Sequence, residues 1–322
     1  MTENREFATS KNSSAVLAML PARPGLYLKI SALAEDPKTT VDQIAREILT
    51  DGAATMALLR LANSAAYYRR RQIPSISEAI TVVGLDGVRV LLLTVSLQRV
   101  FRPEASELQN RLWREAVTTA VISRAIAGLL PPRDGTLPER AYIAGLLHDM
   151  GRLALLHEYG PIALRDESAE EVLKVEQRRF GHSHAELGAA IATDWNLPES
   201  IRDAVLLHHD PTAHAADVEL AAIVHVAALL ARHDAAKGVP ERPSPVALLA
   251  LGWIPDDYNT QVQLLTRYHA LAAEIEQGWG HQKNDSMVAP FSRSVHPHIG
   301  AAEEAPVSRA SWDLGRSERH NN

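Results

Sequence analysis

The stretch AGLLHDMGRLALLHEYG, residues 144–160, is apolar or small at most positions but carries an adjacent histidine and aspartate, His148 and Asp149. On a helix, its large apolar residues would lie on most sides of the helix axis, so the stretch predicts a helix at the centre of a core. His148 shares its face with Gly145 and Gly151, which allow a ligand, a metal or another backbone to approach closely. A buried Asp149 needs a compensating partner. Taken alone, the two residues fit either a metal site or a structural pair, with Arg152 one turn away as a partner.

Helical patterns continue on both sides of this stretch. Apolar residues recur at helical period, alternating strand patterns are hard to find, and the fold class we predict is all-α. Helix starts are indicated by the S/T-x-x-E/Q capping box, whose two side chains bond backbone N–H groups of the first turn. The sequence contains this pattern at Thr40–Gln43, Ser75–Glu78, Ser106–Gln109, Ser168–Glu171 and Ser183–Glu186.

A break at VFRPEASE is the candidate boundary between two helical lobes. The segment VFRPEASE (100–107) separates two helical patterns, and PPRDGTLPER (131–140) separates two more. We predict an N-terminal lobe at 13–103 and a second helical lobe at 107–280. Residues 281–322 have scattered charge, prolines and no apolar period, which is typical of a disordered tail.

Composition narrows the classes of function. The 322 residues include no cysteine, so disulfides, thiolate zinc sites and cysteine nucleophiles are excluded, and any metal would be held by His, Asp or Glu. No stretch approaches the roughly 20 apolar residues of a membrane span, so we expect a cytoplasmic protein with no membrane insertion. The net charge of -6 gives no global attraction for nucleic acid.

Three more histidines lie at predicted helix ends. His184 follows Ser183 at a helix start, where the helix dipole favours the neutral imidazole that binds metals. His208 and His209 close another helix in AVLLHHDP (204–211). Each has a structural interpretation, as a residue of the capping turn or as a cation at a helix C-terminus. Together with His148 and Asp149 they have the pattern of a metal-ligand set dispersed over successive helices of a bundle.

These motifs, in this order, resemble the HDOD family, the HD-related output domains of bacterial signalling proteins. The resemblance rests on AGLLHDMGRLALL, FGHSHAELGAAIATDWNLP and IRDAVLLHHDP, and on residues 20–68 and 73–93 with their Asn63–Ser64 pair. Asn63 and Ser64 close a predicted helix, where asparagine suits the left-handed backbone region, so we interpret the pair as structural capping. It covers about 15–235. It implies an all-helical fold whose second lobe is a divergent, HD-like relative of metal-dependent phosphohydrolases.

The resemblance also implies where a metal shell would be incomplete. Active members of the HD superfamily have an earlier histidine and a later aspartate, and the matching positions here hold Glu115 and Ala228. Glu115 could still bind a hard cation, but Ala228 cannot. We therefore expect a vestigial or weak metal site at His148, Asp149, His184, His208, His209 and Glu115, with no catalytic residues and no required cofactor. His225, one turn before Ala228, is interpreted as an ordinary, partly buried histidine.

The sequence analysis therefore predicts a non-catalytic bacterial signalling module that binds protein partners or a small regulatory ligand, and the groove between the lobes is the expected place. A metal-dependent phosphohydrolase is the alternative. A second alternative is a nucleic-acid-binding regulator that uses Arg69, Arg70 and Arg71 beside two tyrosines. Three arginines in a loop of an acidic protein are more typical of a solvated turn or of contact with an acidic partner. The sequence carries no signal for an oligomeric state.

Overall fold

The computed structural model describes residues 23–64, 67, 72–101, 106–131, 135–161, 169–212, 214–232 and 243–252. These residues contain helices and no strand, which confirms the all-α prediction. The expected tail at 281–322, the capping box at Ser168 and the arginines Arg69 to Arg71 lie outside the described residues. So does the expected lobe boundary near residue 103.

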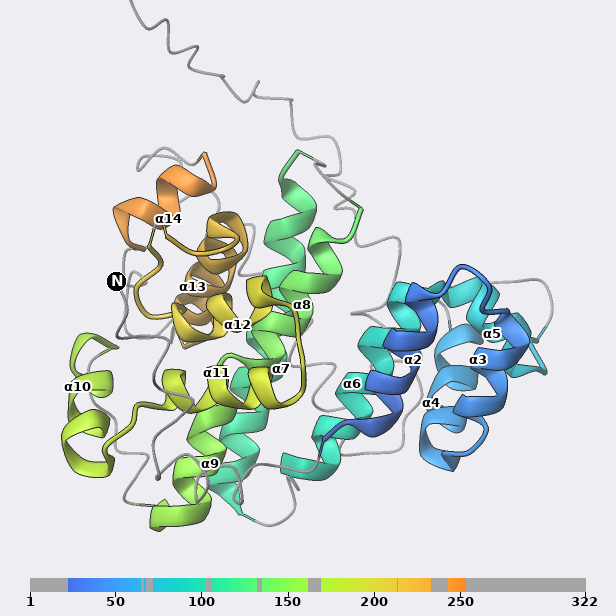
Figure 1. Ribbon diagram of the computed structural model, residues 1–322, viewed down its shortest axis with the longest axis horizontal. Coiled ribbons are helices and arrows are strands. Elements are labelled where there is room, and N and C mark those ends of the chain that lie inside the picture. Colours follow the sequence, from blue (N-terminus) through green and yellow to red (C-terminus); the bar gives the residue numbers. More distant parts are fainter. Residues whose placement is uncertain are drawn as a thin grey trace, which may run out of the picture.

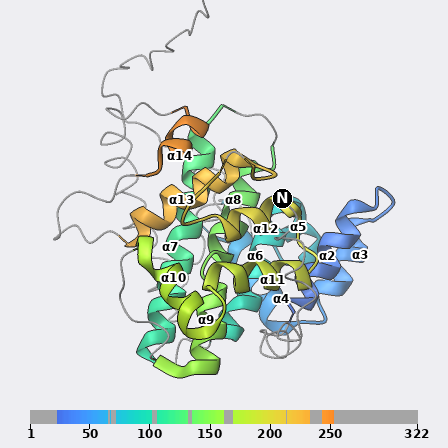
Figure 2. The ribbon, with the colours of Figure 1, turned by 60° about the vertical axis from the view of Figure 1, so that its left-hand side comes forward.

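The helices form two groups (Figure 1). The first group consists of α2 (Gly25–Glu35), α3 (Val41–Ile48), α4 (Gly52–Ala62), α5 (Ile76–Val83) and α6 (Leu85–Phe101). The second consists of α7 (Glu107–Leu129), α8 (Leu137–Leu147), α9 (Met150–Tyr159), α10 (Ala169–Phe180), α11 (His184–Asp194), α12 (Glu199–Leu206), α13 (Val218–Arg232) and α14 (Pro245–Ala250). Figure 2 brings α9, α10 and α11 to the front of this second lobe.

Capping side chains fix several of the helix starts that the sequence predicts. Thr40 and Gln43 form a complete capping box at α3, and Ser183 and Glu186 form another at α11. Ser75 and Ser106 each accept the backbone N–H three residues later, without the reciprocal bond. Caps of this kind are typically worth about 1 kcal/mol each. The cap at Ser183 also fixes the position of His184, the first residue of α11.

Asn63 ends α4 in a way that differs from the sequence-based interpretation. The pattern suggested an asparagine in the left-handed region, but Asn63 has φ -94° and ψ 4°. Its amide instead bridges the loop that follows: its Nδ2 donates to the carbonyls of Leu59 (2.9 Å) and Ile73 (3.0 Å), and its Oδ1 accepts the Ile73 N–H at 2.7 Å. The side chain, rather than a left-handed backbone, closes the loop.

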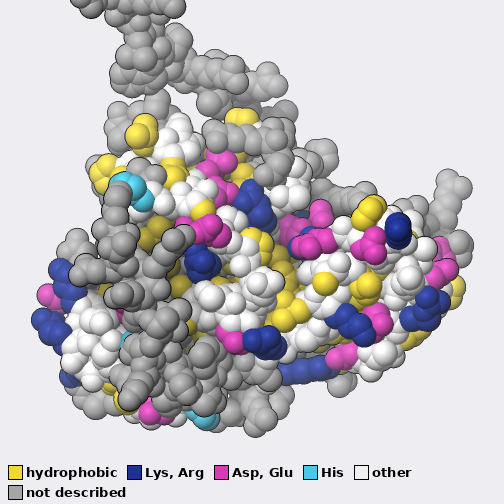
Figure 3. Space-filling model, in the orientation of Figure 1, with side chains coloured by type: hydrophobic (Ala, Val, Ile, Leu, Met, Phe, Trp, Pro, Cys, Tyr) yellow, Lys and Arg dark blue, Asp and Glu magenta, His cyan; other side chains and the backbone are white. Residues whose placement is uncertain are grey.

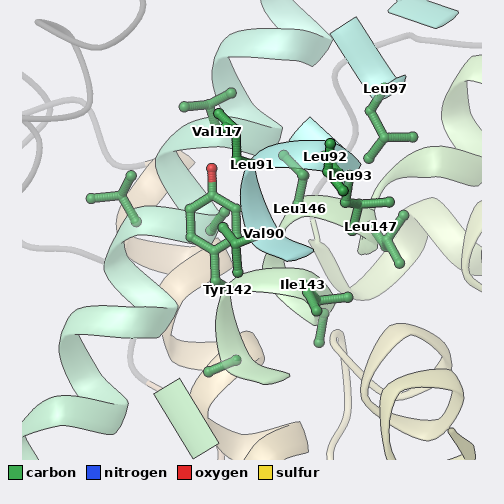
Figure 4. Close-up of a cluster of buried hydrophobic side chains, with 14 of the residues drawn as sticks. Val90, Leu91, Leu92, Leu93, Leu97, Val117, Tyr142, Ile143, Leu146 and Leu147 are labelled. Carbon is green, nitrogen blue, oxygen red and sulfur yellow. The ribbon is translucent and has the colours of Figure 1, made fainter. Parts of the chain in front are cut away.

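Helix α6 lies between the two lobes. It is buried on nearly every face, and Leu91, Leu92 and Leu93 are each at most 1% exposed although they point in different directions. Figure 4 shows these leucines packed near Val117 of α7 and near Tyr142 and other residues of α8. The hydrophobic core is continuous from α2 to α14 through this helix.

In the second lobe, α7, α8 and α13 pack closely around one centre. A Cβ added at Gly145 of α8 would lie 2.7 Å from the Ser123 Oγ and 2.9 Å from the Ala120 Cα, so only glycine permits this crossing of α8 on α7. Helix α13 is buried from Leu220 to Leu230. The three helices bring the end of α8, and with it His148, into the interior.

The described surface carries mixed charge. On the face shown in Figure 3, acidic and basic side chains are interspersed rather than segregated into fields of one sign. Within the described part of the chain, no single helix has the length and apolar character of a membrane span. One pair, Ile76–Val83 with Leu85–Arg99, meets those criteria only when taken together, across a bend of 108°.

Candidate metal centre

Three interruptions between helices position the site. His148 and Asp149 form the turn between α8 and α9, which corrects the expectation of one uninterrupted helix through this stretch. His184 is the first residue of α11, and His208 and His209 follow the end of α12. Breaking the helix at His148 turns the two adjacent side chains toward the ends of α11 and α12.

The structure brings these five side chains together. The Asp149 Oδ1 lies 3.3 Å from the His184 Nε2 and 3.6 Å from the His208 Nε2, and the Asp149 Oδ2 lies 3.5 Å from the His148 Nε2. The His184 Nε2 is 3.0 Å from the His209 Nε2 and 3.3 Å from the His208 Nε2. Four of the five residues are buried and His209 is partly exposed. This cluster is called the His–Asp centre below.

The second ring nitrogen of three imidazoles is already bonded. The His148 Nδ1 lies 2.8 Å from the Gly145 carbonyl, and the His208 Nδ1 lies 2.7 Å from the Val205 carbonyl. A carbonyl oxygen only accepts, so both Nδ1 atoms carry the proton. The His184 Nδ1 likewise donates to the Glu176 carboxylate at 2.7 Å. In the neutral imidazoles, all three Nε2 atoms therefore present lone pairs to the centre.

Those lone pairs face the carboxylate of Asp149, to which no group in the described structure donates a hydrogen bond. Neither oxygen of Asp149 accepts a hydrogen bond within the described structure, although the residue is 2% exposed. Lone pairs on nitrogen and oxygen at 3.3–3.6 Å repel one another unless a cation or proton lies between them. A divalent cation removes this conflict, and a donor set of imidazole nitrogens and carboxylate oxygens suits Zn²⁺, Fe²⁺ or Mn²⁺. The residues present therefore fit a metal ion.

Protonation favours the same conclusion. Burial lowers the pKa of His148 and of His208 to about 4, against the opposing effect of Asp149, so both are neutral at physiological pH. Burial acts to raise the pKa of Asp149, but the positive charge around it, including that of Arg152, prevails and holds the pKa well below its usual range. Neutral imidazoles with an ionised carboxylate are the forms that bind metals.

Glu115 and Ala228 stand apart from the converging atoms. Among the described residues, the ligand atoms that lie within 4.8 Å of one another form two groups, His184–His208–His209 and His148–Asp149–His208, and Glu115 belongs to neither. Burial raises the pKa of Glu115, and the charge of Asp149 adds to this effect, so the two carboxyl groups influence each other. Ala228 is 1% exposed and contributes only its carbonyl, which accepts from the Arg232 Nε at 3.3 Å.

His225 is buried and connects two segments of backbone. Its Nδ1 lies 2.8 Å from the His208 carbonyl, and its Nε2 accepts the Ser244 N–H at 3.1 Å. Both ring nitrogens are thus bonded to backbone. His225 joins the loop that carries His208 to the start of α14.

Sequence reasoning missed Glu176. Its Oε2 accepts from both the backbone N–H (2.8 Å) and the ring Nδ1 (2.7 Å) of His184, and the residue is 3% exposed. A carboxylate behind a metal-binding imidazole is a common arrangement, since it fixes the tautomer and increases the ring's basicity. Its position in the sequence could have identified it. Glu176 lies midway between Val172 and Phe180 on one face of α10, so a charged residue interrupts an apolar stripe.

Comparisons with known proteins agree with this architecture. Residues 20–211 match the model of the HDOD domain. An HDOD domain protein of unknown function from Geobacter sulfurreducens is 29% identical, with a TM-score of 0.59 over 79% of this chain and 92% of that one. An uncharacterized protein of Treponema pallidum (strain Nichols) is 33% identical over 198 residues, which are 59% of this chain but only 38% of that protein.

A more distant structure shares the fold alone. A protein from Shewanella amazonensis SB2B named "Putative metal-dependent phosphohydrolase" is 20% identical, with a TM-score of 0.55 over 79% of this chain and 91% of that one. Since the family model matches more than half of the residues, including every residue of the His–Asp centre, the chain belongs to the HDOD domain family.

Proposed function

We propose that this chain is a non-catalytic signal-transduction module whose second lobe holds one divalent transition-metal ion in the His–Asp centre. The observation that supports metal binding is the set of three imidazoles whose Nδ1 protons are committed elsewhere while their Nε2 lone pairs face an unbonded Asp149 carboxylate. Such preorganisation favours a better-held ion than the vestigial or weak site expected from the sequence. The bound metal supplies a fixed positive charge that orders the ends of α8, α11 and α12.

The absence of turnover is proposed from the charges around the centre. Hydrolysis at a metal requires an open coordination position and enough ligands to hold the ion and activate water. Ala228 offers no carboxylate, and Arg152 lies 3.8 Å from the Asp149 Oδ2. Arg232 also lies near enough to lower the pKa of His148 and His209. These two guanidinium groups near the His–Asp centre disfavour the binding of a second cation there. The output is then binding of a signalling protein or a small regulatory ligand, and nucleic acid is not the expected partner.

The test measures metal content and hydrolysis in the same preparations. We expect about one Zn, Fe or Mn per chain by elemental analysis, with loss of the metal in Asp149→Asn and His184→Ala. His157→Ala is the matched control, because His157 is exposed on α9. No variant should hydrolyse cyclic dinucleotides or generic phosphodiesters. A wild-type protein that binds no metal after incubation with each ion would overturn the proposal.

A phosphohydrolase is the second candidate, and Glu115 is the observation that favours it. Burial and the charge of Asp149 raise the pKa of Glu115, as expected of a proton-transferring group, and its Oε2 makes no hydrogen bond within the described structure. Metal-dependent hydrolysis that disappears in both His148→Ala and Glu115→Gln would establish this function instead. Activity that survives in His148→Ala would indicate a contaminating enzyme.

A further inference from the structure

Helix α10 is anchored to the second lobe by few buried side chains. Of its residues with described side chains, only Val172 and Glu176 are buried, and Phe180 stacks on Tyr159 with ring centroids 4.4 Å apart. The helix lies at the outer edge of the lobe in Figure 1. It also packs against α11. One of its two buried side chains is thus a carboxylate, which is an unusual anchor for a surface helix.

The Glu176 carboxylate is buried only because His184 receives it. A carboxylate removed from water needs charge-assisted hydrogen bonds in return. The Glu176 Oε2 accepts two bonds, both from His184, while its Oε1 makes none within the described structure. The energy with which α10 docks therefore depends on the donor strength of the His184 ring.

A metal on the opposite nitrogen changes that donor strength. When the His184 Nε2 binds a dication, the ring loses electron density and its Nδ1–H becomes a stronger donor to a carboxylate. From this geometry we infer that Glu176 is the positioning residue of His184 and that it couples the docking of α10 to the occupancy of the His–Asp centre. The inference rests on the proposed metal binding. It implies that the outer surface of the lobe, where α10 docks, changes when the metal binds.

The coupling is reciprocal, so the effect of docking on metal affinity and the effect of metal on docking must be equal in size. If docking of α10 lowers the metal dissociation constant by a given factor, metal binding raises the docking equilibrium of α10 by the same factor. Loss of a carboxylate behind a metal-bound histidine typically weakens metal binding about 10- to 100-fold. The same factor should separate the hydrogen-exchange rates of the α10 amides with and without metal. Trypsin gives a second reading of docking at the exposed Arg178 and Arg179.

The experiment uses the full chain with Zn²⁺ and Co²⁺ as probes. In the wild type, metal should slow exchange in residues 169–180 and cleavage at the two arginines. In Glu176→Ala, metal should bind about 10- to 100-fold more weakly and give no protection of α10, and the Co²⁺ absorption spectrum should shift. Glu176→Gln keeps an acceptor without charge, so it should recover part of the affinity and report on the site even if Glu176→Ala folds poorly. Glu171→Gln, exposed on the same helix, should match the wild type.

The outcomes separate the two proposals. A wild type that binds neither ion overturns the metal centre and this inference with it. Tight metal binding in the wild type, with unchanged affinity and unchanged α10 protection in Glu176→Gln and Glu176→Ala, overturns the coupling alone. Protection and affinity that change by clearly different factors also overturn it, because linkage requires one factor for both.

Discussion

Under the proposed metal binding, we expect Asp149 to contribute to stability mainly through the cation that it would hold. Its two oxygens make no hydrogen bond in the described structure, so without metal the ionised side chain is compensated through nearby charge such as that of Arg152, 3.8 Å away. We expect Asp149→Asn to reduce the free energy of unfolding of the metal-saturated protein by about 3 kcal/mol at 100 times the dissociation constant. After chelation we expect a smaller difference, because Arg152 still favours the ionised aspartate. Urea denaturation with and without chelator measures both values, and an equal loss in both conditions would show that Asp149 is a structural residue.

Glu139 is a second buried carboxyl group, at the junction of the lobes. Burial raises its pKa to about 7 from 4.5, opposed by Arg89 and assisted by Asp86. The Arg89 Nε lies 3.3 Å from the Glu139 Oε1, but neither atom has a hydrogen-bond partner in the described structure, so the pair is badly aligned. The folded protein therefore favours the protonated, neutral form of Glu139.

This raised pKa predicts a pH dependence of stability. Because the folded state binds the proton more tightly than the unfolded state, the contribution of Glu139 is complete below pH 4.5 and is lost as the pH rises through about 7. At about 1.4 kcal/mol per pKa unit, the loss approaches about 3 kcal/mol. Glu139→Gln should remove this pH-dependent loss. The free energy of unfolding of the variant should therefore rise relative to that of the wild type between pH 5 and pH 8, as measured by urea denaturation. The exposed Glu171→Gln is the control, and parallel pH curves for wild type and Glu139→Gln would contradict the assignment.

At the scale of the helices, the sequence predicted where a helix begins better than where a helix is interrupted. Caps are local, so the hydroxyls of Thr40 and Ser183 could be read directly from the chain. The break at His148 could not, because the apolar period runs on without a proline and the break depends on which helices α9 meets. The residues of the proposed metal centre could be recognised by type, and three of its histidines by their place at predicted helix ends. Glu176 was missed because its role depends on tertiary contact with α11.

The contact between α9 and α11 explains that break and gives a test. A Cβ on Gly151 would lie 1.9 Å from the His184 carbonyl oxygen, with its carbon at 2.7 Å and the Gly188 N at 2.9 Å. Backbone atoms cannot move aside as a flexible side chain would. Gly151→Ala should therefore separate α9 from α11, destabilise the protein by about 3 kcal/mol and weaken metal binding at His184. Thermal melts and chelator competition measure the two effects.

Gly128 of α7 is the matched control for this substitution. A Cβ there meets nothing within 4 Å. Gly128→Ala should leave the His–Asp centre unchanged and be neutral or stabilising by up to about 1 kcal/mol, since alanine is the better helix former. If the two variants behave alike, the close approach of α9 and α11 does not position the centre.

At the scale of the whole molecule, the two lobes share one core. Helix α6 packs its leucines against both lobes, and the buried apolar cluster extends from Tyr27 to Leu251. A surface contact adds to this link: the Arg23 guanidinium at the start of α2 donates to both Asp194 oxygens at the end of α11, at 2.9 and 2.7 Å. Residue patterns along the chain led us to expect two lobes, but the continuity of the core between the two groups of helices depends on long-range packing that a linear pattern does not encode.

A shared core predicts that damage in the first lobe unfolds the second. Leu58 of α4 is fully buried, and Leu58→Ala should cost about 2–5 kcal/mol by loss of contacts and creation of a cavity. All five tryptophans lie after residue 112, so their fluorescence reports on the part of the chain beyond α6, whereas far-UV circular dichroism reports on all helices. In a cooperative molecule both signals should shift to the same lower urea midpoint. Leu49→Ala, at a side chain 57% exposed, should change stability by less than about 0.5 kcal/mol. A fluorescence midpoint that stays at the wild-type value while the dichroism midpoint falls would show that the lobes unfold separately, and α6 would then belong energetically to the first lobe alone.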